Sequence, residues 1–106
     1  MRAVLTALAL LAAGPALAGG GLREGIYCPV GVDLNPILVD GRGVAIDGLD
    51  CEGARFEGAR LKAKACWTNG GHTVPYDVPI RMLADGSIEH DGARFRWHPA
   101  PPCPVQ

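Results

Sequence analysis

Residues 83–98 have the sequence LADGSIEHDGARFRWH. Two Asp-Gly dipeptides divide this stretch, and such dipeptides favour tight hairpin turns because they reach positive φ cheaply. After the second turn, apolar and cationic residues alternate over 93–98. A period of two is typical of a half-buried strand, so Phe95 and Trp97 are expected to point inward. The stretch therefore predicts successive antiparallel hairpins.

The same turn chemistry recurs along the chain. Further hairpin turns are expected at Asp40-Gly41, Asp47-Gly48 and Asn69-Gly70. The runs between turns alternate or carry β-branched residues, and strands are expected at 36–39, 44–46, 60–67, 79–84, 87–90 and 93–98. In the 60–67 run, Leu61, Ala63 and Ala65 are expected on one face. We predict an all-β fold, a small antiparallel meander of about six strands that forms a sandwich or a half-open barrel.

Composition sets limits on the kind of protein. The chain has 106 residues, of which 48% are hydrophobic and 20% charged, and this predicts one folded domain. Ten Lys and Arg residues against eleven Asp and Glu residues give a formal charge of −1, so no nucleic-acid partner is expected. Fifteen Gly and nine Pro residues leave no stretch long enough for a helical bundle.

Residues 1–18 are expected to be a cleaved signal peptide. Arg2 precedes an apolar run, Gly14-Pro15 breaks that run, and small residues at 16 and 18 suit cleavage after Ala18. The apolar run of about eleven residues is shorter than the roughly 20 that a membrane span needs, so no span is expected. A buried N-terminal helix is the alternative. The mature domain would comprise residues 19–106 and would be periplasmic or secreted.

The chain has 4 cysteines, an even number that predicts two disulfides in a short exported protein. Three pairings are possible. We favour Cys51–Cys66, which would link neighbouring strands, and Cys28–Cys103, which would tie the start of the domain to its end. No two cysteines have the spacing of zinc ligands, so a zinc site is the weaker alternative and no metal or other cofactor is expected.

A spacing of five residues separates Cys51, Phe56, Leu61 and Cys66. The run around them, EGARFEGARLKA from Glu52 onward, resembles the sequence of pentapeptide-repeat proteins over about twenty residues. In that family four units make one coil of a square β-helix, and one coil cannot bury itself without stacked neighbours. We interpret the run as a strand, a Gly-containing bend and another strand, with a repeat solenoid as the alternative.

Several short motifs occur in a characteristic order. They are Gly25-Ile26-Tyr27-Cys28, the 44–48 segment leading to Cys51, the 61–66 segment, the 83–88 segment with its Asp-Gly turn, and Cys103. In this order the chain resembles a group of small exported bacterial proteins with two disulfides. The resemblance covers most of the mature chain. It implies an all-β periplasmic domain and supplies no catalytic residue.

Candidates for catalysis are few. His72, His90 and His98 could act as bases, whereas Ser87 is the one serine of the sequence and lacks a Gly-x-Ser-x-Gly context. Four paired cysteines would leave no thiolate nucleophile. A set of acidic residues suits either a weak calcium site or a solvated edge: Asp40, Asp47, Asp50, Glu52 and Glu57. We expect no enzyme, and a small hydrolase or metal-dependent enzyme is the least favoured alternative.

Two features are candidate binding sites. Residues 68–79 are too rich in Gly and Pro for a central strand and are expected to form an exposed loop, with His72 and Tyr76 as its contacts. Cations alternate along two predicted strands: Arg60, Lys62 and Lys64 on one, and Arg94, Arg96 and His98 on the other. If the two strands adjoin, they would form a basic patch, unless acids such as Glu89 interleave with the cations.

The function expected from these features is a non-enzymatic periplasmic or secreted domain of the binding or inhibitor type. It would present the 68–79 loop and the cationic strand face to a periplasmic protein or an anionic envelope component. Exported lysozyme inhibitors are similar in size, disulfide use and β architecture, which is a likeness of class. The alternative is a structural or stress-related envelope protein without a discrete ligand site.

Overall fold

The structure is a computed structural model that describes residues 17–18 and 21–105. Most of the predicted signal peptide lies outside the described residues; its end, Leu17–Ala18 (β1), pairs with Leu22–Arg23 (β2). Cleavage after Ala18 would remove this short pair. Among the described residues, no helix is long and apolar enough to cross a membrane.

One antiparallel sheet of 10 strands forms the rest of the described domain. Its strands are Gly25–Pro29 (β3), Ile37–Asp40 (β4), Gly43–Ile46 (β5), Leu49–Glu52 (β6), Arg55–Glu57 (β7), Arg60–Trp67 (β8), Thr73–Pro79 (β9), Arg81–Met82 (β10), Ile88–His90 (β11) and Ala93–His98 (β12). Their order across the sheet is β10-β11-β12-β3-β4-β5-β6-β8-β7, and β9 also pairs with β8. Because β6 and β7 pair with opposite ends of β8, they lie end to end beside it.

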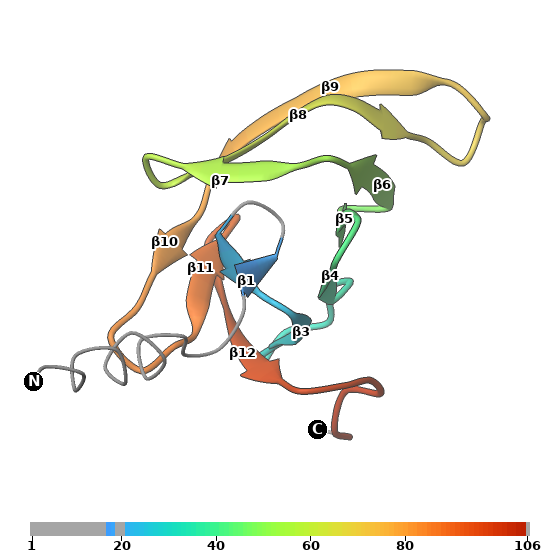
Figure 1. Cartoon of the computed structure of the whole chain (residues 1–106). Coiled ribbons are helices and arrows are strands. Elements are labelled where there is room, and N and C mark those ends of the chain that lie inside the picture. Colours follow the sequence, from blue (N-terminus) through green and yellow to red (C-terminus); the bar gives the residue numbers. More distant parts are fainter. Residues whose placement is uncertain (1–16, 19–20, 106) are drawn as a thin grey trace, which may run out of the picture.

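The sheet curls into a half-barrel. In Figure 1 the β8–β9 ribbon arches over the top, β10, β11 and β12 lie on one side, and β3, β4, β5 and β6 lead back up on the other. The all-β prediction is confirmed, in its half-open barrel form. The sheet has more strands than the sequence predicts, because 25–29, 49–52, 55–57 and 73–79 also pair. Of the expected 79–84 strand, residue 79 ends β9 and 81–82 form β10.

Two of the expected turns have the geometry that joins adjacent strands most tightly. Asp47 and Gly48 have φ values of 52° and 77°, and Asp91 and Gly92 have values of 53° and 78°. Paired positive φ values are the mark of a type I′ turn, whose twist matches that of the strands it connects. The first turn joins β5 to β6 and the second joins β11 to β12, so the Asp-Gly signal correctly predicts both hairpins.

The residues spaced by five lie on three antiparallel strands. Cys51 is on β6, Phe56 on β7, and Leu61 and Cys66 on β8, with turns at 53–54 and 58–59 between them. In the register Cys51 lies opposite Cys66, and Phe56 lies opposite Leu61. The repeat-solenoid alternative is therefore wrong. The run also has two bends where we expected one, because each of its glycine-containing turns ends a strand.

A β-bulge in β8 changes which side chains face the core. Residues 64–65 lie opposite Pro75 alone, and proline is tolerated in strands at bulges and edges. An extra residue shifts the alternation by one, so Cys66 beyond the bulge is buried and Trp67 is exposed. Strict alternation predicted Ala65 on the inner face. That prediction is wrong, because Ala65 belongs to the bulge and is exposed.

The hydrophobic core fills the curl of the sheet. Tyr27 and Phe95 are its largest fully buried side chains, and Trp97 packs against it half-buried. The inward orientation expected of Phe95 and Trp97 is confirmed. Aliphatic residues complete the core: Leu22, Ile37, Val39, Val44, Ile46, Leu61, Ile80 and Ile88.

Both expected disulfides are present. Cys28 on β3 is bonded to Cys103 in the C-terminal tail, and Cys51 on β6 is bonded to Cys66 on β8. None of the four cysteines is free. Disulfides persist in oxidising compartments and are rare in the cytosol, so the bonds indicate a location outside the cytosol.

Gly43 lies where β5 and β6 approach too closely for a side chain. A Cβ there would overlap the carbonyl oxygen of Cys51 and lie 2.9 Å from Cα of Glu52. Because these are backbone atoms, they cannot rotate away, and we expect Gly43→Ala to lower the free energy of unfolding by about 1–3 kcal/mol. Urea unfolding of the oxidised protein measures this. Gly41→Ala is the control, since its Cβ would meet only Glu24 Oε2, at 3.6 Å; equal losses would contradict the prediction.

Candidate functional site

The 68–79 segment is a short turn followed by an edge strand. Residues 73–79 form β9, which pairs with β8, and 68–72 form the turn between them. Within the described strands β9 has β8 as its one neighbour, and an edge strand accommodates prolines because it needs ladder hydrogen bonds on one side only. The expectation of an exposed loop over the whole segment is therefore wrong.

His72 and Tyr76 have different surroundings. His72 is exposed in the turn, and its Nδ1 lies 3.3 Å from the hydroxyl oxygen of Thr68. Tyr76 is half-buried on β9, and its hydroxyl donates a hydrogen bond to Oδ2 of Asp47. The polar end of Tyr76 therefore already has an internal partner, and the turn itself retains His72 as its exposed contact.

Tyr76 belongs to a polar cluster for which the sequence gives no signal. His90, at the end of β11, is 6% exposed, and its Nε2 lies 3.1 Å from Oδ2 of Asp47, the oxygen that accepts from Tyr76. Asp47 lies in the β5–β6 turn, so the cluster joins three parts of the curled sheet. Tyr76 and His90 are 29 and 43 residues from Asp47, and only the curl of the sheet brings them together.

The arrangement of this cluster suits a structural role. The imidazole of His90 contacts Asp47 through Nε2, whereas its buried Nδ1 has no hydrogen-bond partner among the described residues. The ring of His90 also packs against Phe95, with 6.1 Å between the ring centroids.

Tyr76 couples the stability of the domain to alkaline pH. Burial, and then the hydrogen bond to Asp47, raise the pKa of Tyr76 above its ordinary value of about 10. The folded protein holds the phenolic proton of Tyr76 more tightly than the unfolded chain does. Its contribution to the free energy of unfolding is therefore complete below pH 10, and it is lost as pH rises through the raised pKa of the folded state.

We expect Tyr76→Phe to cost about 1 kcal/mol at pH 7, through the lost hydrogen bond, and to make stability fall less steeply above pH 10. Urea unfolding at pH 7, 9, 10 and 11 measures both effects. Tyr27, whose pKa is also raised by burial, is present in both proteins and provides a common background. An unchanged slope between pH 9 and 11 would show that Tyr76 is not the coupled group.

Ser87 has a role in its own turn. Its hydroxyl donates a hydrogen bond to Oδ1 of Asp85, and its backbone N–H donates to the same oxygen. These two bonds lower the pKa of Asp85. In the described part of the chain, no histidine is hydrogen-bonded to Ser87, and no three potential metal ligands gather.

The two cationic strand faces do not meet. β3, β4, β5 and β6 lie between β12 and β8 in the sheet order, so the condition for one basic patch is not fulfilled. Acids interleave instead: Arg60 Nε lies 2.7 Å from Oδ1 of Asp77, and Glu89 lies opposite Arg94 and pairs with Arg81 at 2.9 Å.

The remaining cations line hollows of mixed charge or small size. Lys62 and Lys64 line a hollow of about 650 Å³ together with a third cation, Arg55. Three acids line the same hollow: Glu52, Glu57 and Asp77. Arg96 and His98 line a hollow of about 200 Å³ beside the C-terminal tail. Neither arrangement is a strong anion site, because the first is neutralised by its own acids and the second is small.

Exposed apolar side chains gather in one region of the described surface. Of seven exposed large hydrophobic residues, five are Val30, Val32, Leu34, Leu38 and Trp67. The register places Leu38 in one row with Ala45, Asp50 and Trp67, across β4, β5, β6 and β8. Three strand spacings of about 4.8 Å make this row about 14 Å long. We call Val32, Leu34, Pro36, Leu38 and Trp67 the apolar surface.

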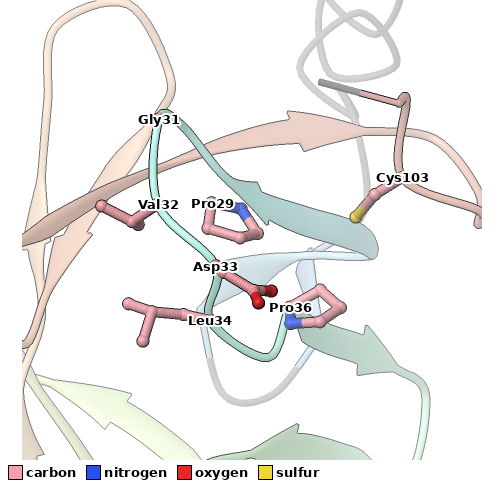
Figure 2. A pocket seen from close by; sticks show the side chains of 7 residues that line it. All are labelled: Pro29, Gly31, Val32, Asp33, Leu34, Pro36 and Cys103. Atoms are coloured by element: carbon pink, nitrogen blue, oxygen red, sulfur yellow. The ribbon is translucent and has the colours of Figure 1, made fainter.

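Two hollows open on the apolar surface. The first, of about 490 Å³, is lined by 31–34 and Cys103; Figure 2 shows the side chain of Asp33 directed toward Pro36, with Val32 and Leu34 on the other side of the loop. The second, of about 400 Å³, lies beside Trp67. Pro36 lines both hollows, so they adjoin.

Comparisons with known proteins give no relative for this chain. No family model, no curated protein and no solved structure matches it. The function therefore has to be inferred from the surface, charges and fold described above. Trp67 and the 30–38 segment were not expected as site residues, although the apolar sequence Val30 to Leu38 with its Gly and Pro residues was a signal that could have indicated them.

Proposed function

We propose that the chain is a non-enzymatic binding domain, periplasmic or secreted, that docks a protein partner on the apolar surface. The observation that carries this proposal is the exposure of Trp67, which is 48% accessible at the end of β8. Tryptophan is enriched among the residues that dominate binding energy in protein interfaces. Exposed apolar side chains that are contiguous and rimmed by polar groups mark interaction sites more often than isolated ones do.

The disulfide-tied sheet supplies the rigidity that a docking surface needs. The bond between Cys51 and Cys66 joins the two strands that carry Asp50 and Trp67. The bond between Cys28 and Cys103 places Cys103 in the wall of the first hollow. A preformed surface loses little conformational freedom on binding, and this favours affinity. The 68–72 turn follows Trp67 and extends the surface with polar residues.

Recovery of a partner with the tagged, exported protein tests the proposal. We expect the wild type and Met82→Ala to recover the same partner, and Trp67→Ala to lose it. Met82 is the matched control because it is also 48% exposed but lies on β10, beyond the far end of β9. Equal recovery by Trp67→Ala and the wild type would overturn the proposal, and it would favour a structural envelope protein without a docking site.

A further inference from the structure

The two tryptophans of the chain are placed differently with respect to cations. The guanidinium carbon of Arg23 lies 3.4 Å from the centroid of the Trp97 ring, and Trp97 Nε1 donates a hydrogen bond to the backbone oxygen of Glu24. Trp67 has no such cation and no side-chain hydrogen bond among the described residues. The ring of Trp67 therefore remains available for the kind of contact that Trp97 already makes within the chain.

Asp50 is the register partner of Trp67 on the neighbouring strand. Asp50 on β6 and Trp67 on β8 are opposite each other in the antiparallel register, and paired Cα atoms in such a register are about 4.5–5.5 Å apart. Asp50 is exposed, and in the described part of the chain no cation pairs with it. A cation placed here could contact both the aromatic face and the carboxylate, two interactions that favour the same charge.

The charge of the surrounding hollows has the same sign. The second hollow has Asp50 as its one charged lining residue, and the first has Asp33. No Lys, Arg or His is among the lining residues of either hollow. Two cations of β8, Lys62 and Lys64, line a different hollow. The charged residues that line these two hollows are thus both acidic.

We infer that the docked segment of the partner is an extended polypeptide that carries basic and apolar side chains at every second position, so that both kinds face the apolar surface. This inference rests on the proposed function and names the chemistry of its partner. A basic side chain would lie over Trp67 beside Asp50, and apolar side chains would contact Leu38 and the 30–34 segment. At about 3.3 Å per residue, four extended residues cover the row from Leu38 to Trp67, which is about 14 Å long.

The probe is a capped octapeptide in which Val and Lys alternate at the odd positions and Ser occupies the even positions, so that Val and Lys share one face when the peptide is extended. Its fluorescence anisotropy with the exported protein is the measurement. We expect it to bind more tightly than the matched Glu and Val peptide. Asp50→Asn should weaken binding about fivefold, as for loss of an exposed ion pair, and Trp67→Ala should weaken it tenfold or more. Added salt should weaken binding of the Lys peptide.

Glu52→Gln is the matched control for the charge of the protein. Glu52 is an exposed carboxylate on the same strand as Asp50, but it lines the hollow of Lys62 and Lys64. The substitution removes one negative charge without changing the apolar surface, so binding of the Lys peptide should be unchanged. Equal weakening by Asp50→Asn and Glu52→Gln would overturn the inference, because attraction to the net charge would then explain the binding.

Two further outcomes would also overturn the inference. One is equal or tighter binding of the Glu peptide, and the other is binding of an N-acetylglucosamine tetramer at the Trp67 ring with no binding of the Lys peptide. These results are distinct from failure of the proposed function. If Trp67→Ala loses the native partner while the Lys peptide fails to bind, the docking surface is correct and its acidic specificity is wrong.

Discussion

Replacing Cys51 and Cys66 together by alanine is expected to lower the free energy of unfolding by about 4 kcal/mol. The bond closes a chain separation of 15 residues, and the chain-entropy model assigns about 3 kcal/mol to a loop of that size. Both sulfurs are fully buried, so their removal also leaves unfilled space in the core. Because the two residues are paired in the β6–β8 ladder, the strands stay ordered in the native state when the bond is removed. Native-state disorder therefore does not offset the loss.

Removing the bond between Cys28 and Cys103 is expected to cost less, about 2 kcal/mol, although its loop is longer. A separation of 75 residues gives about 4.5 kcal/mol in the same model. However, residues 99–105 are exposed apart from Cys103, which is half-buried. The tail would gain freedom in the native state once it is released, at about 1–2 kcal/mol for each residue freed, and this offsets much of the loss.

Urea unfolding of the two double-alanine variants, measured beside the oxidised wild type, decides the order. If the variant without the Cys28–Cys103 bond is the less stable of the two, loop length alone governs the effect, and the C-terminal tail is better anchored than its exposure indicates. The same variant also tests the apolar surface, because Cys103 lines the first hollow. A loosened wall there should weaken partner binding while Trp67 stays in place.

The hairpins were predictable because their signals are local. Asp47-Gly48 and Asp91-Gly92 specify type I′ turns by themselves, and the alternation of 93–98 places Phe95 inside without any tertiary information. The cysteine pairing was also accessible, because a bond between neighbouring strands and a bond between the two ends suit a small domain. The half-barrel itself depends on the curl of the whole sheet. The sequence does not distinguish this half-open barrel from a sandwich.

The candidate site was not predictable because it depends on one irregularity. The bulge at 64–65 reverses the alternation of β8, and without it Trp67 would have been assigned to the inner face with Leu61. Pro75, the residue opposite the bulge, favours a loop when the sequence is considered alone. The cluster of Asp47, Tyr76 and His90 was missed for a related reason, since its members meet only after the sheet curls.

Phe95→Ala is expected to lower the free energy of unfolding by about 4 kcal/mol. Phe95 is 2% exposed, lies opposite Ile88 on one neighbouring strand and Pro29 on the other, and contacts the ring of His90. Truncating a buried Phe costs about 3–5 kcal/mol, because the surroundings close the resulting cavity only in part. A domain of this length has a total stability of about 5–10 kcal/mol, so the variant should be close to unfolding at 37 °C.

Graded substitutions separate the cavity from other effects of the change. Phe95→Leu keeps most of the volume and should cost about 1 kcal/mol, whereas Arg96→Ala, at the next and exposed position of β12, should stay within about 0.5 kcal/mol of the wild type. Thermal unfolding of the oxidised proteins gives the comparison. Because His90 would lose the ring against which it packs, Tyr76→Phe should also cost less in the Phe95→Ala background than in the wild type. Additive losses would mean that the polar cluster is held by its hydrogen bonds alone, and that the core of the half-barrel does not position it.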